Sequence, residues 1–137
     1  MHRWFHHNLR VRVANLCAGL YGLKAAHGGH DNKWHGNVLA YVDNCYMRVV
    51  GGHGYNDAFY DNKCVFVAPT GYSSDCNVSA SWEVHDNEVF SRSGSLEVCG
   101  EEFTKYVAGG HDRGSSVGKW PTDSVLISMG KKVLGMN

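Results

Sequence analysis

A short pattern that recurs along the chain places the strongest constraint on its fold. The pattern is an aromatic residue or Val, two further residues, Asn, and then an apolar-rich run. A repeat of a few tens of residues is typical of solenoids, in which successive units stack and equivalent positions lie above one another. The pattern therefore predicts a stack of similar coils. The asparagines are Asn8, Asn37, Asn62 and Asn87, which are 29, 25 and 25 residues apart.

Short segments with the composition of β-strands follow these asparagines. They contain runs of Val, Leu, Phe and Tyr of strand length, without the 3.6-residue spacing of an amphipathic helix. A second β-prone segment follows in some units, after turn-forming Asp, Asn, Gly or Ser. Several short strands per unit are typical of one solenoid coil. The expected first strands are residues 9–13, 38–42, 63–67 and 88–92, and the expected second strands include residues 45–50 and 95–99.

The recurring Asn has a structural interpretation. Asn tolerates left-handed backbone geometry at a bend, and its side-chain amide can donate a hydrogen bond to the Asn of the next coil. Such an Asn ladder pairs polar groups that a buried bend would otherwise leave without partners. The residues three positions earlier are expected to form an apolar stack inside the coils: Phe5, Trp34, Phe59 and Val84.

The C-terminal segment, residues 121–137, differs in pattern from the coils of residues 1–120. Pro121, Thr122 and Asp123 supply a helix start, apolar residues follow at helical spacing, and Gly135 can end the helix. We expect this helix to cover the open end of the last coil, because solenoids need end caps. The chain is then one all-β domain of about four to five coils with a short helical cap.

The N-terminal end has no corresponding cap in the sequence. Met1 lies seven residues before Asn8, so the first coil is expected to start partway round. We expect either that another protein chain stacks on this coil or that the sequence is a piece of a longer protein. Residues 1–13 contain no apolar signal core.

Together these features resemble the right-handed parallel β-helix families of the pectate-lyase-like superfamily, and the resemblance covers residues 4–117. Many members of that superfamily act on acidic polysaccharides as lyases, hydrolases or epimerases, whereas others are adhesins or fibre proteins. The resemblance implies an extracellular or cell-surface module that binds, or binds and modifies, a polysaccharide. The alternative is a non-catalytic subunit that stacks through its uncapped N-terminal coil, since fold alone does not choose a function.

The tripeptide Gly-Gly-His occurs three times and provides candidate catalytic residues. His30 and His53 end the first two copies, seven and nine residues before their ladder Asn, and are expected in adjacent coils. They could form a general base or a metal pair beside Tyr55, Asp57 and Lys33, a set of groups that could remove a proton next to a uronate carboxylate. The alternative is a glycine-rich turn in which the His contacts solvent or backbone.

Ring side chains occupy the position two residues before each Asn. Strand alternation turns them away from the apolar stack, so that they could form a flat strip that binds sugar rings or a partner. The alternative is an ordinary solvent-exposed face, which we expect more often for such a row of side chains. The rings belong to His6, His35, Tyr60 and His85, of which the last three are the binding candidates.

Asp61 and Asp86 lie directly before their asparagines and are expected to stack. Adjacent carboxylates could share Ca²⁺. The preceding units have His7 and Gly36 at this position, so the ion site is incomplete. The two aspartates are therefore interpreted as structural turn residues, and no metal site is predicted.

The five cysteines include no C-x-x-C pair, which disfavours a zinc-ribbon or thioredoxin-like site. Cys17 and Cys45 lie nine and eight residues after their ladder Asn, and Cys76 and Cys99 lie fourteen and twelve after theirs. Stacked coils therefore predict disulfides Cys17–Cys45 and Cys76–Cys99 in an oxidising compartment, with Cys64 as a core thiol. The alternative is that all five are small buried residues.

Charge and motif content disfavour several functional classes. Thirteen basic residues balance thirteen acidic ones, which leaves no net field to attract nucleic acid. No apolar run approaches the roughly 18 residues of a membrane-spanning helix. The sequence also lacks G-x-S-x-G, P-loop, dinucleotide-binding and H-E-x-x-H motifs, so it identifies no reaction.

Overall fold

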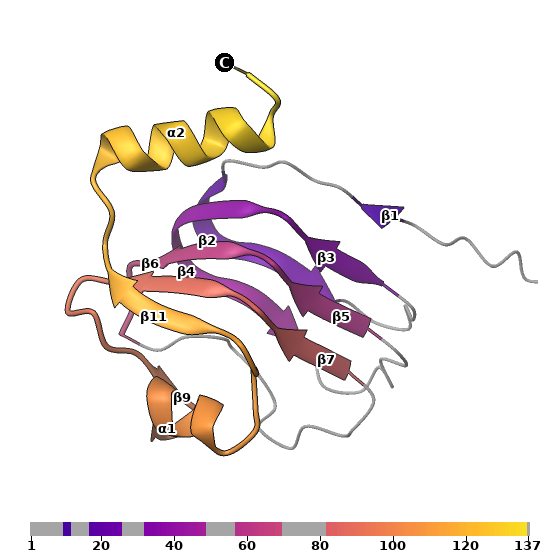
Figure 1. The fold of residues 1–137 in the computed structure, drawn as a ribbon, viewed down its shortest axis with the longest axis vertical. Coiled ribbons are helices and arrows are strands. Elements are labelled where there is room, and N and C mark those ends of the chain that lie inside the picture. Colours follow the sequence, from indigo (N-terminus) through magenta and orange to yellow (C-terminus); the bar gives the residue numbers. More distant parts are fainter. Residues whose placement is uncertain (1–9, 12–16, 26–31, 49–56, 70–81, 137) are drawn as a thin grey trace, which may run out of the picture.

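The computed structural model describes residues 10–11, 17–25, 32–48, 57–69 and 82–136. This part of the chain is mostly β, with two parallel sheets (Figure 1). Sheet A contains, in spatial order, β1 (Arg10–Val11), β3 (Lys33–His35), β5 (Asp57–Tyr60) and β7 (Trp82–His85). Sheet B contains β2 (Cys17–Ala25), β4 (Val38–Arg48), β6 (Lys63–Phe66), β8 (Glu88–Ser91) and β11 (Ser116–Lys119).

A strand of sheet A, a two-residue bend and a strand of sheet B follow one another three times along the chain. In sheet A, Trp34 aligns with Phe59 and Phe59 with Val84, so each neighbouring strand is 25 residues further along the sequence. The sheet B strands after the bends begin with the same offset. The described strands form two sheets rather than a closed solenoid. Residues 26–31, 49–56 and 70–81, which lead from sheet B back to sheet A, lie outside the described part.

The inner faces of the two sheets enclose the main hydrophobic core. Phe59 is fully buried there, and its neighbours Trp34 and Val84 pack against the core as partly buried side chains, as the repeat predicts. Burial of a large apolar side chain of this kind contributes about 1.5–3 kcal/mol. The buried residues of this cluster are Leu39, Val42, Cys45, Phe59, Cys64, Phe66, Val89, Leu96, Val98 and Phe103.

The first repeat does not lie where the sequence pattern placed it. Alignment on Asn8 predicts that residues 9–13 pair with residues 38–42. Instead, Arg10 of β1 aligns with Lys33 in sheet A, and Cys17 of β2 aligns with Leu39 in sheet B. The match of residues 5–8 to the repeat therefore predicts the wrong register. The register of the first unit is set by the pairing of the nine-residue strand β2 with β4. Phe5 and Asn8 themselves lie outside the described residues.

The predicted turn between residues 38–42 and 45–50 is also absent, because β4 runs without a break from Val38 to Arg48. It contains a β-bulge instead. Leu39 and Val42 of β4 align with Cys64 and Phe66 of β6, so β4 has one more residue than its neighbour between these points. Tyr41 lies in the bulge with a φ of 57°, an uncommon conformation for a residue other than Gly.

A short segment between β8 and β11 covers one end of the core, and the sequence pattern did not predict its helix. It consists of an antiparallel pair, β9 (Glu97–Val98) and β10 (Glu101–Glu102), and α1 (Phe103–Ala108). Figure 1 shows α1 beyond β7 and β11, and Phe103 is buried in the core cluster with Val117 packed against that cluster. α1 therefore takes the place at the end of the core that was predicted for the C-terminal helix.

The predicted C-terminal helix is present as α2 (Asp123–Val133), but its expected role as the end cap is wrong. Leu126 packs with Ala40 of β4 and Val65 of β6 in a second cluster, on side chains that alternate with the inward residues of sheet B. The helix thus covers the outer face of sheet B (Figure 1). The physical reason is that sheet B is apolar on both faces, a property of parallel sheets covered on each side.

Neither helix in the described part of the chain has the length and apolar character needed to cross a membrane.

Candidate functional site

The buried asparagines form a hydrogen-bonded row along the bends. The side-chain amide and backbone N–H of Asn37 donate to Asn62 Oδ1 at 2.8 and 3.1 Å. The same two groups of Asn62 donate to Asn87 Oδ1 at 3.2 and 3.0 Å. All three residues are only 1% exposed. Each asparagine therefore satisfies polar groups of its neighbour where water cannot reach.

The left-handed residue at each bend is the residue before the Asn, which corrects the expectation that the Asn itself adopts this geometry. Gly36, Asp61 and Asp86 have φ values of 69°, 54° and 53°. Glycine adopts such values freely, and Asp does so more readily than most residues. The two aspartates are exposed turn residues. Within the described residues, no group of three or more His, Cys, Asp or Glu side chains could hold a metal ion.

Asp112 continues the row one repeat after Asn87, although the pattern search did not include it. Asn87 Nδ2 donates to Asp112 Oδ1 at 3.3 Å, while the Asn87 backbone N–H donates to Ser115 Oγ at 2.6 Å. The Ser115 hydroxyl donates in turn to the Asp112 carboxylate. At the last bend, Asp112 and Ser115 together therefore accept the two hydrogen bonds that a single Asn accepts at the earlier bends. The signal that could have found Asp112 is its spacing of 25 residues from Asn87.

Asp57, a candidate catalytic residue, has a structural environment. Its carboxylate accepts hydrogen bonds from the backbone N–H and side-chain amide of Asn32 at 2.8 and 3.0 Å, and the residue is only 3% exposed. The other members of the candidate cluster, His30, His53 and Tyr55, lie outside the described residues. Asp57 therefore stabilises the fold rather than facing a ligand in solvent.

The third Gly-Gly-His copy is described and has a structural role. Gly109 is the C-cap of α1, and Gly110 follows with a φ of 90°. His111 stacks on Tyr106 of the same helix, with ring centroids 4.7 Å apart. Burial raises the pKa of Tyr106, and the nearby Asp112 and Glu101 carboxylates raise it further. In this copy the glycines end a helix, which agrees with the turn interpretation.

The ring side chains before the bends stack on one another. The rings of His35 and Tyr60 are 4.9 Å apart and within 6° of parallel, and those of Tyr60 and His85 are 5.0 Å apart and within 2°. Each stacked pair contributes about 0.5–1.5 kcal/mol beyond its burial. Because the faces between rings are covered, Tyr60 offers no free face for a sugar ring. The row therefore stabilises adjacent strands and presents ring edges outward.

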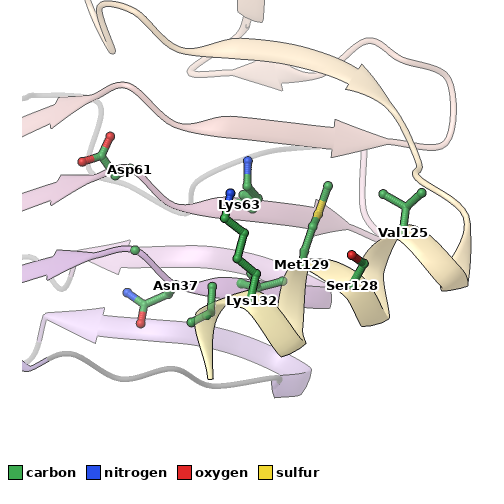
Figure 2. A pocket seen from close by; sticks show the side chains of 10 residues that line it. Asn37, Asp61, Lys63, Val125, Ser128, Met129 and Lys132 are labelled. Carbon is green, nitrogen blue, oxygen red and sulfur yellow. The ribbon is translucent and has the colours of Figure 1, made fainter. Parts of the chain in front are cut away.

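An open groove of about 510 Å³ lies between α2 and the start of β4 and β6 (Figure 2). Its lining combines apolar side chains with lysine and hydroxyl groups, which no sequence pattern indicated. The reason is that α2 and the bends are far apart in sequence. The lining residues are Gly36, Asn37, Val38, Asp61, Lys63, Val125, Ser128, Met129, Lys132 and Val133.

Lys63, Lys132 and Asp61 are the charged residues that line this groove. Lys63 forms an ion pair with Glu88 on the next strand, and its side chain is 31% exposed. Lys132 is exposed and has no ion-pair partner within the described residues. Figure 2 shows the Lys132 side chain extending from α2 toward Lys63, while the Asp61 carboxylate points away from both. The lysine charges of the groove are therefore offset in part by Glu88 and by Asp61, which also lines it.

The contacts that hold α2 beside the groove are not repeated from one unit of the fold to the next. The Tyr41 hydroxyl donates to Asp123 Oδ1 at 2.6 Å, and the Tyr41 ring meets Trp120 edge-on at 5.3 Å. Trp120 Nε1 donates to the Phe66 carbonyl at 2.9 Å, and the Arg92 guanidinium lies 4.5 Å from the Trp120 ring centroid. The hydrogen bond to Asp123 raises the pKa of Tyr41, with further contributions from burial and the Asp123 charge.

The disulfide pattern corrects the sequence prediction. Cys45 is bonded to Cys64, with Cα atoms 5.9 Å apart, so the predicted Cys17–Cys45 bond and free Cys64 thiol are both wrong. The prediction considered only equivalent positions of stacked units, whereas this bond joins residues from different positions of the buried core. Cys99 is also disulfide-bonded. Cys76 lies outside the described residues, so the Cys76–Cys99 pair stays a prediction.

Comparison with known proteins gives no match: no family model, no curated protein and no solved structure is similar to this chain. The geometry described above is therefore the basis for a functional proposal.

Proposed function

We propose that this chain is a right-handed parallel β-helix module, secreted or at the cell surface, that binds an extended polysaccharide along its side. The β-helix is supported by the offset of 25 residues shared by both sheets and by the Asn row at the bends. An extracellular location is supported by the Cys45–Cys64 bond, because disulfides persist mainly in oxidising compartments.

The single observation that carries the binding proposal is the groove beside α2. Val38, Val125 and Met129 give it an apolar lining, and Ser128 and Lys132 add hydrogen-bonding groups. Sugar rings present apolar C–H faces and hydroxyl edges, so a mixed lining of this kind suits them. An open groove also lets a long chain pass through it, whereas an enclosed pocket would select a small molecule.

Binding is proposed without a reaction. Asp57 is buried and hydrogen-bonded to Asn32, so its carboxylate is not placed to exchange a proton with a bound sugar. Catalysis by His30, His53 and Tyr55 would need a site on residues outside the described part. The groove residues are therefore proposed to bind a ligand and not to catalyse a reaction on it.

The groove can be tested with two serines of the same helix. Ser128 lines the groove and Ser124 does not, and both are exposed. Ser128→Met should fill part of the groove and weaken polysaccharide binding by about tenfold, whereas Ser124→Met should leave it unchanged. Titration calorimetry against a panel of purified polysaccharides measures both affinities. Equal affinities for the two variants would place binding elsewhere, and no binding to any polysaccharide would refute the proposal.

An assembly subunit is the second candidate function, and the outer side of α2 favours it. Ile127 of α2 and its C-cap residue Leu134 are 57% and 55% exposed, and their spacing of seven residues places them on one side of the helix, where a partner could cover both. The N-terminal coil around Phe5, the interface expected from the sequence, lies outside the described residues. Light scattering separates the two functions: a mass that rises with concentration supports assembly, and a constant monomer mass opposes it.

A further inference from the structure

The groove side of α2 has two parallel stripes of side chains. Val125, Met129 and Val133 follow one another at intervals of four residues, and Ser128 and Lys132 do so beside them. Residues four apart lie above one another on a helix, about 6 Å apart along its axis. One stripe is therefore apolar and the other polar along the same wall of the groove (Figure 2).

Among the described residues, the charges at the groove cancel. Lys63 forms its ion pair with Glu88, so a carboxylate already matches this ammonium group. Lys132 and Asp61 line the groove with opposite charges. Beyond a Debye length of about 8 Å, a charged polymer therefore meets no net charge that attracts it.

An acidic group would also lose hydration on entering the groove. A carboxylate placed against Val125 and Met129 leaves water for an apolar lining, which costs far more for a charged group than for a hydroxyl. Lys132 is exposed, and an exposed ion pair returns little of this cost. A sugar hydroxyl, by contrast, can form a hydrogen bond with Ser128.

We infer that the groove binds an uncharged stretch of polysaccharide, with ring faces on the apolar stripe of Val125, Met129 and Val133 and hydroxyl groups toward Ser128 and Lys132. The inference rests on the proposed function and adds the class of polysaccharide. This class differs from the acidic substrates that the sequence resemblance implies. Acidic groups on the polymer weaken binding, and salt leaves the affinity for a neutral polymer unchanged, because no net charge is screened.

Two matched pairs of polymers test the class. Fully methyl-esterified polygalacturonate and polygalacturonate are the same chain without and with charge, and hydroxyethylcellulose and carboxymethylcellulose form a second pair. Titration calorimetry should show binding to the neutral member of at least one pair, about tenfold tighter than to its acidic member. Raising the salt concentration about tenfold should change the neutral affinity by less than about twofold. Tighter binding of the acidic member, or loss of neutral binding in salt, would overturn the inference.

Asp61→Asn tests the charge balance directly. It removes one negative charge from the lining, and Asn tolerates the left-handed backbone that Asp61 adopts, with a φ of 54°. The lysines are then no longer offset, so the affinity for the acidic member should rise by about threefold, while the neutral affinity changes by less than about twofold. An unchanged affinity for the acidic member would contradict the charge argument.

The apolar stripe has a matched control on the same helix. Val125→Thr replaces a methyl group of the stripe by a hydroxyl and should weaken neutral binding by about threefold. Ile127→Thr makes a comparable change at an exposed residue outside the groove lining and should leave the affinity unchanged. Equal losses in the two variants would overturn the contact with the stripe.

The inference and the proposed function can fail separately. If an acidic polymer binds more tightly and Ser128→Met still weakens its binding, the groove binds polysaccharide and only the neutral class is wrong. If no member of either pair binds and no other purified polysaccharide does, both fail.

Discussion

The interior of the two sheets and the outer face under α2 are stabilised by different kinds of contact. Inside, one type of hydrogen bond recurs, from Asn37 to Asn62 and from Asn62 to Asn87. Outside, α2 is held by contacts that occur once, such as that between Tyr41 and Asp123. The interior groups are buried, whereas the Tyr41–Asp123 pair is exposed to solvent.

This difference determines whether a substitution should destabilise the whole domain or only the element that it contacts. A buried polar group that loses its partner cannot pair with water, so the free energy of unfolding falls for the whole domain. An exposed hydrogen bond is replaced by water, and the element that it holds can open without the rest. Interior substitutions should therefore lower global stability, and substitutions under α2 should loosen α2 alone.

The largest effect is expected from Asn62→Ala. This change removes the acceptor of both Asn37 donors, the side-chain donor to Asn87 Oδ1 and the hydrogen bond to the Trp34 carbonyl, while the backbone N–H of residue 62 can still donate to Asn87 Oδ1. With several buried groups left without partners, the free energy of unfolding should fall by about 4 kcal/mol. Urea unfolding followed by circular dichroism measures the change.

The neighbouring bend residue provides the control for Asn62→Ala. Asp61 is exposed and left-handed, and Gly36 occupies the equivalent position one repeat earlier. Asp61→Gly should therefore change the unfolding free energy by less than about 1 kcal/mol. If the two variants lose similar stability, the difference between the buried row and the exposed bend does not hold.

A smaller loss is expected when the interior bond between Cys45 and Cys64 is removed. The bond joins residues 19 apart in sequence. Replacement of both cysteines by Ala should lower the free energy of unfolding by about 3 kcal/mol, mainly through the entropy of the unfolded chain. Denaturant unfolding measures this loss, with the Cys99→Ala variant as a comparison. Peptide mapping of the unreduced protein checks the pairing itself, and a Cys17–Cys45 peptide would contradict it.

The repeated interior was also the part that the sequence predicted best. Asn62 and Phe59 occur in a pattern that returns after 25 residues, and pairing in sheet A brings Phe59 beside Trp34 and Val84 at this offset. Repetition carries this information because stacked units place the same residue type in the same environment. The signal weakens where the spacing changes, as it does before β3, and the first repeat was misplaced for that reason.

The candidate groove could not be predicted from such a pattern. It depends on the position of α2, which is held by the hydrogen bond from Tyr41 to Asp123 and by the packing of Leu126 against Ala40. Lys63 and Lys132 line one groove only because α2 folds back across the outer face of sheet B. Contacts between unique segments far apart in sequence follow from packing, and periodicity contains no information about them.

The smallest effect, and the sharpest test of the comparison, is expected from Tyr41→Phe. This change removes the hydrogen bond to Asp123 and keeps the ring beside Trp120. Amide hydrogen exchange in α2 should become about threefold to tenfold faster, as expected for one exposed hydrogen bond, while exchange in β6 and β8 stays unchanged. Mass-spectrometric exchange resolves these segments. A similar acceleration in the strands would show that α2 and the interior unfold as one unit.

The pH dependence of the same contact has a defined sign. The hydrogen bond to Asp123 raises the pKa of Tyr41 in the folded protein. The contribution of this contact is therefore complete below the unfolded pKa of about 10 and is lost as pH rises through the higher folded value. Tyrosinate absorbance, taken as the difference between wild type and Tyr41→Phe, should show Tyr41 ionising above this pH. Asp123→Asn should lower that pKa, because it removes the negative charge beside the hydroxyl. An unchanged titration in Asp123→Asn would mean that Tyr41 does not hold α2 through Asp123, and the outer face would then depend on Trp120 and the apolar contacts of Leu126.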